Sequence, residues 1–380
     1  MRLFSVICVA SLLLAGCDGE EPGAGDGDGG DVIVDVDGGA AGDGAVQPAS
    51  GTAPTRAVAG EVAAGATNPV AVPAGGVGIW RVETTAGEHV AFRLDFPSAT
   101  TGVVMAVVRW DGAAPVDLGK TDAGAGLRVL AVLDQGGPRT FWVRIEARAG
   151  ALSGTLKVTR TPFTEGVRCA TDCDRLLQLP LPNDARVDGY DISGAIYRYQ
   201  FGRRDLVMFL REAGRRMIAA GQVPFLPEDL SQWDGLTPGT DVGATRHASH
   251  QRGKDVDVSL YGSDGGSAWR SFCTTTSVDG GRACVNGTAK GLDARATARE
   301  LAGFYEGGIV TMMFLDQELI ELVRPAAAPL AKDGVIATSL VPLYSDGTHL
   351  QHWPNHDNHV HVRVSEAAKL VIGVEPVEPP

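Results

Sequence analysis

Two short segments hold most of the residues in this chain that could do chemistry. SHQRGKDVD spans residues 249–257 and HDNHVHVRV spans residues 356–364, and together with His247 they hold five of the eight histidines. Asp255 and Asp257 lie beside the first cluster. Imidazole and carboxylate are the donors that Zn²⁺ takes in catalytic sites, where three protein ligands leave the fourth position to water. The residue types therefore predict a zinc centre.

Strand alternation brings the polar residues of each segment to one face. In DVDV, Asp255 and Asp257 share a face, and in HVHVRV, His359, His361 and Arg363 do the same, while the valines share the opposite faces. If both strands lie in one sheet with their valines in the core, the polar sides converge. The alternative is a set of surface histidines with a solvated acidic pair, but matching polarity on two strands favours a metal site. We expect His250, Asp257 and His361 to be its ligands.

These motifs resemble those of the penicillin-insensitive murein endopeptidases. Those enzymes belong to a wider group of zinc peptidases that includes lysostaphin-type and D-Ala-D-Ala-cleaving enzymes. The group shares a His, six residues and an Asp, here His250 to Asp257, and a downstream His-x-His, here His359 to His361. The narrower resemblance rests on Ser249-His250-Gln251, on Asp-Val-Asp-Val and on the extra histidines His247 and His356, and it covers roughly residues 180 to 366.

The resemblance implies a role for each of these residues. Zinc would be held by His250, Asp257 and His361, with His359 and His356 as the catalytic or transition-state-stabilising pair and His247 nearby. Family spacing makes Asp257 the ligand.

Two neighbouring charged residues are left with supporting roles. Asp255 would orient an imidazole, as metal sites require. Arg363 would meet either a substrate carboxylate or a surface ion pair. His349 and His352, in a turn-rich stretch, are expected to be loop residues.

The implied reaction is hydrolysis of peptide cross-links in peptidoglycan, at amide bonds between D-Ala and a diamino acid. No Glu lies beside the second motif, so an imidazole must be the general base, and His359 is the first choice. No serine acyl-enzyme would form, which would explain insensitivity to β-lactams. The alternatives are a zinc D,D-carboxypeptidase or dipeptidase acting on stem peptides, and a non-catalytic wall-binding lipoprotein. Lys254 and the loop with Cys273 and Cys284 depart from the family and leave the cross-link preference open.

Hydrophobic periodicity divides the chain into two folded parts. Residues 58–162 show the two-residue period of half-buried strands, which predicts an all-β sandwich-like accessory domain in which His89 faces water. Residues 163–368 mix helix and strand, and the fold class expected there is an α+β zinc peptidase domain with a small antiparallel sheet. Helices are expected over RRDLVMFLREAGRRMIAAG, ARATARELAGFYEGG and DQELIELVR, the last ended or kinked by Pro325. A tail follows over residues 369–380.

The first 57 residues predict export and a tether. Residues 1–16 have the proportions of a signal peptide, and Leu14-Ala15-Gly16-Cys17 resembles the bacterial lipobox, in which the Cys carries the lipid. An ordinary cleaved signal is the alternative. Residues 17–57 are rich in Gly, Ala and Asp and are expected to be a disordered acidic tether. The protein would be a lipoprotein anchored to a membrane in the periplasm, with inner and outer membrane both open.

Four cysteines remain after Cys8 and Cys17 are set aside. An even number in an oxidising compartment favours two disulfides among Cys169, Cys173, Cys273 and Cys284, and three connectivities are possible. A four-cysteine structural zinc site is the competing interpretation.

Charge argues against nucleic acid as a partner. The net charge is -13, but nine acidic residues with no Lys or Arg lie between Asp18 and Asp43, so the rest carries about -4. Nucleic-acid binding would need a basic face, which neither value indicates.

Overall fold

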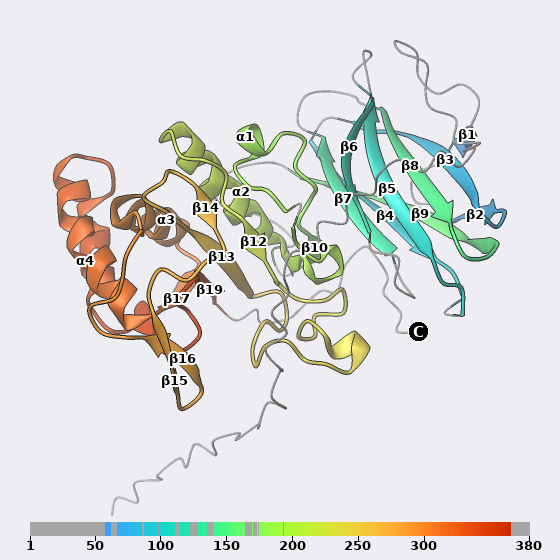
Figure 1. Cartoon of the computed structure of the whole chain (residues 1–380). Coiled ribbons are helices and arrows are strands. Elements are labelled where there is room, and N and C mark those ends of the chain that lie inside the picture. Colours follow the sequence, from blue (N-terminus) through green and yellow to red (C-terminus); the bar gives the residue numbers. More distant parts are fainter. Residues whose placement is uncertain are drawn as a thin grey trace, which may run out of the picture. The chain divides into compact units, whose positions relative to one another are not determined.

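The computed structural model shows a chain built mainly from β-strands (Figure 1). It describes residues 58–61, 67–85, 87–97, 99–110, 115–121, 128–134, 140–163, 169, 173, 175–192 and 194–365. The expected signal peptide, the tether with Cys17 and the tail over residues 369–380 lie outside the described residues. All described residues belong to one unit, residues 44–380.

Two sheets with a shared core form the first part of the described chain (Figure 1). One sheet has the order β1 (Val58–Glu61), β3 (Gly76–Glu83), β8 (Thr140–Ala147), β5 (Val103–Trp110), β6 (Pro115–Lys120). The other has the order β2 (Thr67–Val72), β9 (Leu152–Pro162), β4 (Glu88–Asp95), β7 (Arg128–Asp134). Alternate apolar residues are buried between the sheets, among them Phe92, Leu94, Val143 and Ile145, each 0% exposed.

A six-stranded sheet carries both histidine clusters. Its order is β12 (Pro227–Glu228), β13 (Asp255–Tyr261), β19 (His359–Val364), β17 (Val310–Leu315), β18 (Leu350–His352), with β14 (Ser267–Ala268) also paired to β13. β19 runs antiparallel to β13 and to β17, whereas β17 and β18 are parallel. Two two-stranded sheets complete the strands: β10 (Leu176–Gln178) with β11 (Phe201–Arg203), and β15 (Thr275–Val278) with β16 (Gly281–Cys284).

Three longer helices accompany the six-stranded sheet (Figure 1). They are α2 (Arg204–Ala219), α3 (Ala294–Glu306) and α4 (Gln317–Lys332); the shorter elements are α1 (Ala185–Asp188) and the 3-10 turns η1 (Tyr197–Tyr199), η2 (Thr240–Val242) and η3 (Thr338–Tyr344). The Asp293 carboxylate accepts hydrogen bonds from the first backbone N–H groups of α3, and Asp316 does the same for α4. Both helices thus begin at an acidic cap.

The α+β fold class expected from the sequence, with a small antiparallel sheet, is wrong. Among the described residues the chain is mostly β-sheet, with 19 strands and four α-helices. The sheet that holds the histidine clusters has six strands and mixed direction. The sequence pattern missed β12, β14 and β18 because strands of two or three residues are too short to show a period.

Two local expectations are also wrong. His352 lies on β18 rather than in a loop. His89 is 1% exposed, and its Nε2 lies 2.8 Å from the carbonyl oxygen of Gln178. Burial lowers the pKa of His89 to about 4. Of the two outcomes expected at Pro325, an end or a kink, the end does not occur, since α4 continues through Pro325 and Pro329 to Lys332. Both prolines are exposed, so water can bind the backbone carbonyls that they leave without an N–H partner.

Two disulfides are present, Cys169 with Cys173 and Cys273 with Cys284. They are the pairings closest in sequence, and they are typical of a protein outside the cytoplasm. None of the helices among the described residues is long and apolar enough to cross a membrane.

A buried carboxyl group on α3 bears on stability. Glu300 is 1% exposed, and neither of its carboxyl oxygens has a hydrogen-bond partner among the described residues. Burial raises the pKa of Glu300 well above its ordinary value of 4.5. The folded state therefore holds more protons than the unfolded state above that value, so this group makes stability fall as pH rises.

We expect Glu300→Gln to stabilise the fold increasingly as pH rises from about 5 to about 8. Glutamine fills nearly the same volume and does not titrate. The variant therefore avoids a decrease in the free energy of unfolding of up to about 1.4 kcal/mol per pH unit. Urea unfolding at several pH values measures the difference. Glu306→Gln, on the exposed side of the same helix, is the control. A difference between wild type and Glu300→Gln that stays constant with pH would show that Glu300 does not titrate in this way.

Candidate metal centre

The register between β13 and β19 places the two clusters opposite each other. Asp257 pairs with His361, Asp255 with Arg363, and Ser259 with His359. The valines of both strands are at most 1% exposed and lie on the other face; they are Val256, Val258, Val360, Val362 and Val364. The arrangement expected from strand alternation is therefore present.

A tight loop before β13 turns the His250 ring toward Asp257. His250 and Arg252 have φ angles of 63° and 61°, and Gly253 has φ 64°, all in the left-handed region. A Cβ on Gly253 would lie 2.6 Å from the backbone N of Arg203, so only glycine fits there. The His250 N–H donates to Asp255 Oδ2 at 3.1 Å, which holds the turn closed. Strained backbone of this kind occurs at functional sites, where neighbouring contacts stabilise it.

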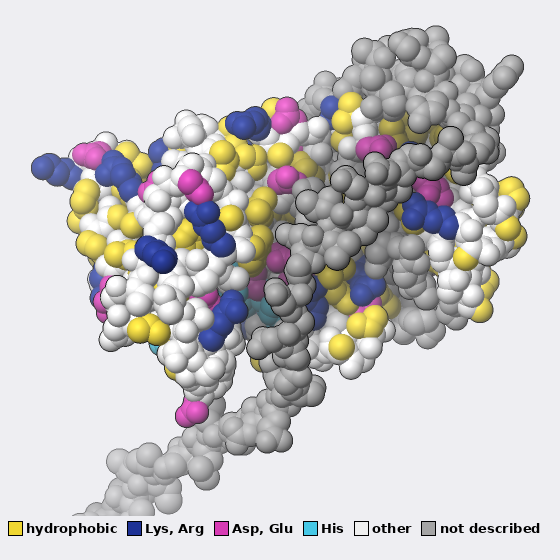
Figure 2. All heavy atoms as spheres, in the orientation of Figure 1, with side chains coloured by type: hydrophobic (Ala, Val, Ile, Leu, Met, Phe, Trp, Pro, Cys, Tyr) yellow, Lys and Arg dark blue, Asp and Glu magenta, His cyan; other side chains and the backbone are white. Residues whose placement is uncertain are grey.

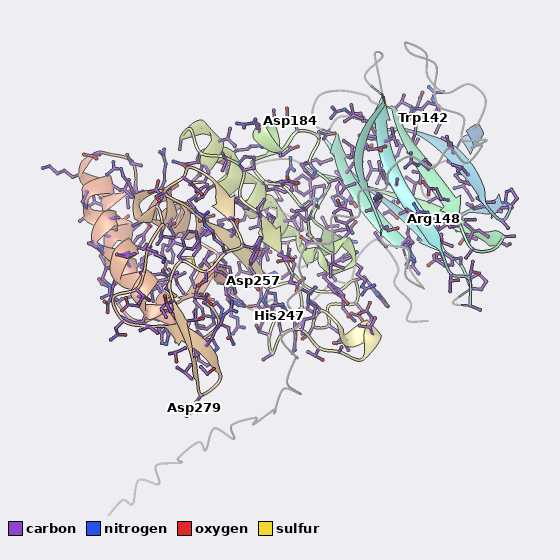
Figure 3. All side chains as sticks on the ribbon, in the orientation of Figure 1. Trp142, Arg148, Asp184, His247, Asp257 and Asp279 are labelled. Atoms are coloured by element: carbon purple, nitrogen blue, oxygen red, sulfur yellow. A yellow bond between two sulfur atoms is a disulfide. The ribbon has the colours of Figure 1, made fainter. Side chains whose placement is uncertain are left out.

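Three side-chain atoms converge between the strand and the loop. His361 Nδ1 lies 3.0 Å from Asp257 Oδ1 and 3.1 Å from His250 Nε2, and His250 Nε2 lies 3.3 Å from Asp257 Oδ1. All three residues are at most 3% exposed. His247 adds a fourth group, because suitable atoms of His247, His250 and Asp257 lie within 4.8 Å of one another. Figure 3 labels His247 and Asp257 close together.

Hydrogen bonds at the far side of each ring fix which nitrogen carries a proton. His250 Nδ1 contacts the carbonyl oxygen of Asp229, so Nδ1–H donates and Nε2 keeps its lone pair. His361 Nε2 lies 2.9 Å from Asp255 Oδ1, so Nε2–H donates there and Nδ1 is the nitrogen that faces Asp257. One nitrogen of each ring and one oxygen of Asp257 thus face the same point. Positive charge stabilises such an arrangement, and the site could hold a metal ion.

The pKa shifts of His361 and Asp257 also indicate that positive charge stabilises the site. Burial alone would lower the pKa of His361, but hydrogen bonds to Asp255 and Asp257 raise it to about 9. Burial would raise the pKa of Asp257, yet the charges of His250 and His359 hold it well below its usual value. Without a metal, a proton on His361 supplies the missing charge.

Asp255 accepts several hydrogen bonds beside the metal-facing atoms. Its Oδ1 accepts from His361 Nε2 and, at 2.6 Å, from Arg363 Nε, and it is 0% exposed. Burial would raise its pKa, but the hydrogen bond and charge of His361 and the charge of Arg363 lower it to about 2. Of the two roles left open for Arg363, the structure shows the ion pair. The hydrogen bond to Asp255 restrains the orientation of the His361 ring.

Asp229 supports the other side of the site and was missed by the sequence analysis. Its Oδ2 lies 2.7 Å from His247 Nε2 and 3.1 Å from Arg246 Nε, while its backbone carbonyl accepts from His250. His247 Nε2–H therefore donates to Asp229, and its Nδ1 faces Asp257 Oδ2 at 3.9 Å. Asp229 has φ 33°, an uncommon value for a non-glycine residue. That left-handed value was the only local clue, and it is not readable from the sequence.

His359 and His356 border the metal-facing atoms. His359 Nε2 lies 3.6 Å from Asp257 Oδ1, and its Nδ1–H donates to Asn358 Oδ1 at 2.7 Å. His356 Nδ1–H donates to the carbonyl oxygen of Pro354 at 2.7 Å. Burial lowers the pKa of both rings, that of His356 to about 3. Both therefore hold an unprotonated Nε2 at neutral pH.

Aromatic side chains surround the two rings. The ring centroid of Trp269 lies 5.4 Å from that of His359, and Phe314 lies 5.4 Å from both His361 and Trp353. Trp353 is 56% exposed. Figure 2 shows histidine side chains reaching the surface beside acidic ones on this face of the molecule. The site is therefore buried at the metal-facing atoms and open to solvent at its edge.

Two histidines from the same part of the sequence have other partners. His349 Nδ1 pairs with Asp346 Oδ2, and His352 Nδ1 accepts a hydrogen bond from the N–H of Gln317 at 3.0 Å. Among the described residues, neither contacts the metal-facing atoms. The structure brings together His247, His250, Asp255, Asp257, His356, His359, His361 and Arg363.

Comparison with known proteins does not assign the chain to a family. No family model matches it, and no curated protein matches it. The solved structures that match do so weakly. The pre-peptidase C-terminal domain of a collagenase from Bacillus anthracis is 7% identical, with 27% of this chain and 97% of that one covered and a TM-score of 0.23. A periplasmic inhibitor of g-type lysozyme from Aeromonas hydrophila is 14% identical (25% and 85% covered, TM-score 0.20), and a mitogen from Yersinia pseudotuberculosis is 12% identical (27% and 86%, TM-score 0.21). Likeness at this level carries no argument about the site.

We expect Asp255→Asn to weaken metal binding by about 10- to 100-fold without abolishing it. All three metal-facing residues remain, but the His361 ring loses the carboxylate that orients it. Chelator competition on purified protein measures the affinity. Asp264→Asn, which removes an exposed carboxylate paired with Arg270, is the control and should change nothing. Unchanged affinity in Asp255→Asn would show that Asp255 has no part in positioning the ring.

Proposed function

We propose that the protein is a zinc-dependent peptidase that hydrolyses peptide cross-links in peptidoglycan. The observation that carries this proposal is the set of three potential ligand atoms on His250, His361 and Asp257, 3.0 to 3.3 Å apart. A further histidine, His359, lies 3.6 Å from the same carboxylate oxygen. The motif resemblance to murein endopeptidases supports the choice of substrate, at amide bonds between D-Ala and a diamino acid.

Zinc fits the donor set better than other common ions. Two imidazoles and one carboxylate are the ligands of many catalytic zinc sites, whereas Ca²⁺ and Mg²⁺ prefer oxygen donors. Ligand atoms about 2.0 to 2.1 Å from a tetrahedral zinc ion lie about 3.3 Å apart, close to the separations found here. When bound, zinc supplies a Lewis acid that polarises a carbonyl and activates water. Asp255 and Asp229 hold the two imidazoles in the required tautomers.

His359 is the proposed general base. Its Nδ1–H is committed to Asn358, so Nε2 is the nitrogen that can take a proton. That nitrogen lies 3.6 Å from Asp257 Oδ1, so it would be near a water held by a metal at this carboxylate. The water oxygen forms a bond to the scissile carbonyl carbon as its proton passes to His359. The same proton then goes to the leaving amine as the carbon–nitrogen bond breaks.

His356 is proposed to assist from behind His359. The two ring centroids are 4.7 Å apart, and His356 Nε2 is the nitrogen free of the Pro354 contact. Burial keeps this ring neutral at neutral pH, so it would take up a proton only as negative charge develops on the oxyanion beside it. No serine is acylated in this scheme, and β-lactams act by trapping an acyl-serine, so the activity should be insensitive to them.

The protein is further proposed to act from a membrane tether in the periplasm. The two disulfides support a location outside the cytoplasm. The lipobox-like run that ends at Cys17 supports lipidation, with the acidic stretch over residues 17–57 as the tether. Peptidoglycan would then lie within its reach.

Variants of the histidines should separate metal ligands from the general base. We expect His250→Ala, Asp257→Ala and His361→Ala each to lose zinc and activity together, because two protein donors hold the ion poorly. His359→Ala should keep near-stoichiometric zinc and lose on the order of 10²-fold or more in turnover, the usual scale for a general base. Metal analysis and mass analysis of cleaved soluble muropeptides measure the two effects.

His349→Ala is the matched control, since His349 pairs with Asp346. It should keep both zinc and activity. Zinc lost from His359→Ala but kept in His361→Ala would overturn the assignment of ligand and base. Full zinc with no cleavage of any muropeptide by the wild type would overturn the proposed reaction.

We expect Cys17→Ser to release the protein from the membrane fraction or to block its processing. Serine cannot form the thioether that carries the lipid, and a tether without lipid has no membrane affinity. Fractionation and labelling with a fatty-acid analogue measure this, with Cys8→Ser, inside the expected signal peptide, as the control. Normal processing and membrane retention of Cys17→Ser would exclude the lipid anchor.

A further inference from the structure

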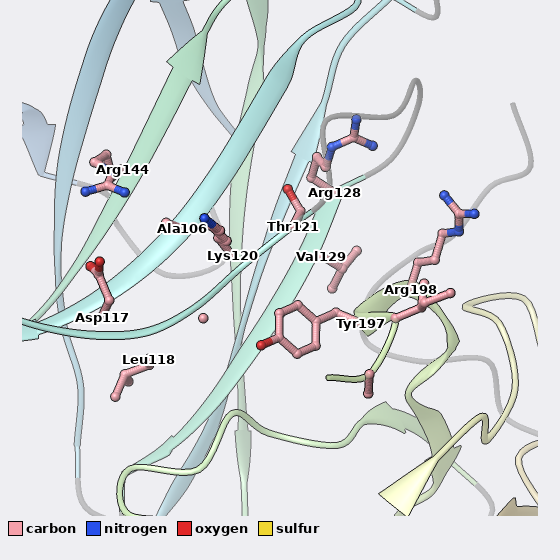
Figure 4. A pocket seen from close by; sticks show the side chains of 13 residues that line it. Ala106, Asp117, Leu118, Lys120, Thr121, Arg128, Val129, Arg144, Tyr197 and Arg198 are labelled. Atoms are coloured by element: carbon pink, nitrogen blue, oxygen red, sulfur yellow. The ribbon is translucent and has the colours of Figure 1, made fainter. Parts of the chain in front are cut away.

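A cavity of about 580 Å³ lies away from the metal-facing residues, in the first part of the described chain. Its walls come from β5, β6, β7 and β8 and from residues 195–198 at η1 (Figure 4). This volume is typical of pockets that hold a small molecule. Hydrogen bonds fasten the walls together, since Gln178 Nε2 donates to the carbonyl oxygens of both Val129 and Tyr197. Gln178 therefore links the β7 wall of the pocket to the wall at η1.

The lining is rich in positive charge although the whole chain carries -13. Lys120, Arg128, Arg144 and Arg198 line it, against a single carboxylate, Asp117. The excess of cations at this one place selects for an anionic ligand.

Acidic neighbours offset part of that charge. Arg144 Nε lies 3.3 Å from Glu146 Oε1, and Arg198 Nε lies 3.3 Å from Asp241 Oδ2. Arg128 Nε donates to the carbonyl oxygen of Val103 at 3.2 Å. Lys120 is exposed and has no ion pair with another described residue, so its ammonium group is the most available cation of the lining.

An aromatic ring and aliphatic side chains complete the walls. Figure 4 shows the Tyr197 ring pointing into the space between Lys120, Leu118 and Val129. Gly119 permits this position, because a Cβ there would lie 2.9 Å from the Tyr197 hydroxyl oxygen. A flat ring beside apolar side chains suits the apolar face of a pyranose, and the Tyr197 hydroxyl can exchange hydrogen bonds with sugar hydroxyls.

We propose that this pocket binds an acidic saccharide, with the pyranose face on Tyr197 and the carboxylate at Lys120. The Lys120 ammonium group favours a charged ligand. The Tyr197 ring favours a sugar over a bare anion. The site goes beyond the proposed peptidase activity and does not depend on the metal centre.

Two sugars that differ in one charged group test the proposal. N-acetylmuramic acid carries a carboxylate on a lactyl ether, and N-acetylglucosamine is the same ring without it. Calorimetric titration of the full chain, with excess chelator to keep the metal centre out of the measurement, should show binding of the acid and at least about fivefold weaker binding of the neutral sugar. That ratio corresponds to one exposed ion pair.

Charge reversal at one position provides the second measurement. Lys120→Glu should weaken binding of the acid by about fivefold or more, while the matched control Lys332→Glu, at the exposed end of α4, should leave it unchanged. Tyr197→Leu should weaken binding of both sugars. Equal affinity for the two sugars, no binding of either, or equal effects of the two lysine variants would overturn the proposal.

The source of the sugar is decided in a separate arm. Co-sedimentation with peptide-free glycan strands would identify the cell wall as the source, whereas binding of the free sugar alone would identify a soluble acidic sugar. Cleavage of soluble muropeptides is measured in parallel. Loss of sugar binding with intact cleavage would then count against the pocket alone, and the reverse against the peptidase alone.

Discussion

The register of β13 against β19 is the constraint on which the candidate site depends. Because Asp257 is paired with His361, the carboxylate and the imidazole leave the sheet side by side on one face. A slip of one residue would bring a valine to that face and send the metal-facing groups into the apolar core. The buried valines on the opposite face prevent the slip, since exposing even one of them costs about 1.5 kcal/mol or more. The hydrophobic core thus sets the geometry of the polar site.

Burying the titratable side chains of the site costs free energy, and contacts with neighbouring residues offset that cost. Asp255, Asp257, His250 and His361 are all buried, and buried charges are stable only when they are paired and hydrogen-bonded. Asp255 accepts from a ring, a guanidinium and a backbone N–H, so its own charge is balanced. Asp257 Oδ1 instead faces His250 Nε2 and His361 Nδ1, and its charge is balanced by a cation or by a proton on His361. The difference between the two carboxylates explains why one orients and the other faces the metal position.

The part of the site that could be predicted from the sequence is the part that depends on local periodicity. A two-residue alternation puts Asp255 with Asp257 and His359 with His361, and no tertiary information is needed for that. Asp229 could not be predicted, because it reaches the site through a loop and a left-handed backbone that leave no pattern in the sequence. The fold class failed for a related reason. Strands such as β18 have three residues and pair in parallel, so only the folded sheet reveals them.

The segment that carries His356 is held by the hairpin of β15 and β16 as well as by the sheet. Arg282 Nε donates to Asp357 Oδ1 at 2.9 Å, and the N–H of Asn355 donates to the carbonyl oxygen of Arg282 at 2.7 Å. The Cys273–Cys284 disulfide closes the base of this hairpin, and the N–H of Cys284 donates to the Asp316 cap of α4. Figure 3 shows Asp279 at the hairpin tip. A catalytic group must be held within a fraction of an ångström of its working position. The cross-linked hairpin is bonded to the loop that carries His356, for which a catalytic role is proposed. The disulfide would therefore serve positioning as well as stability.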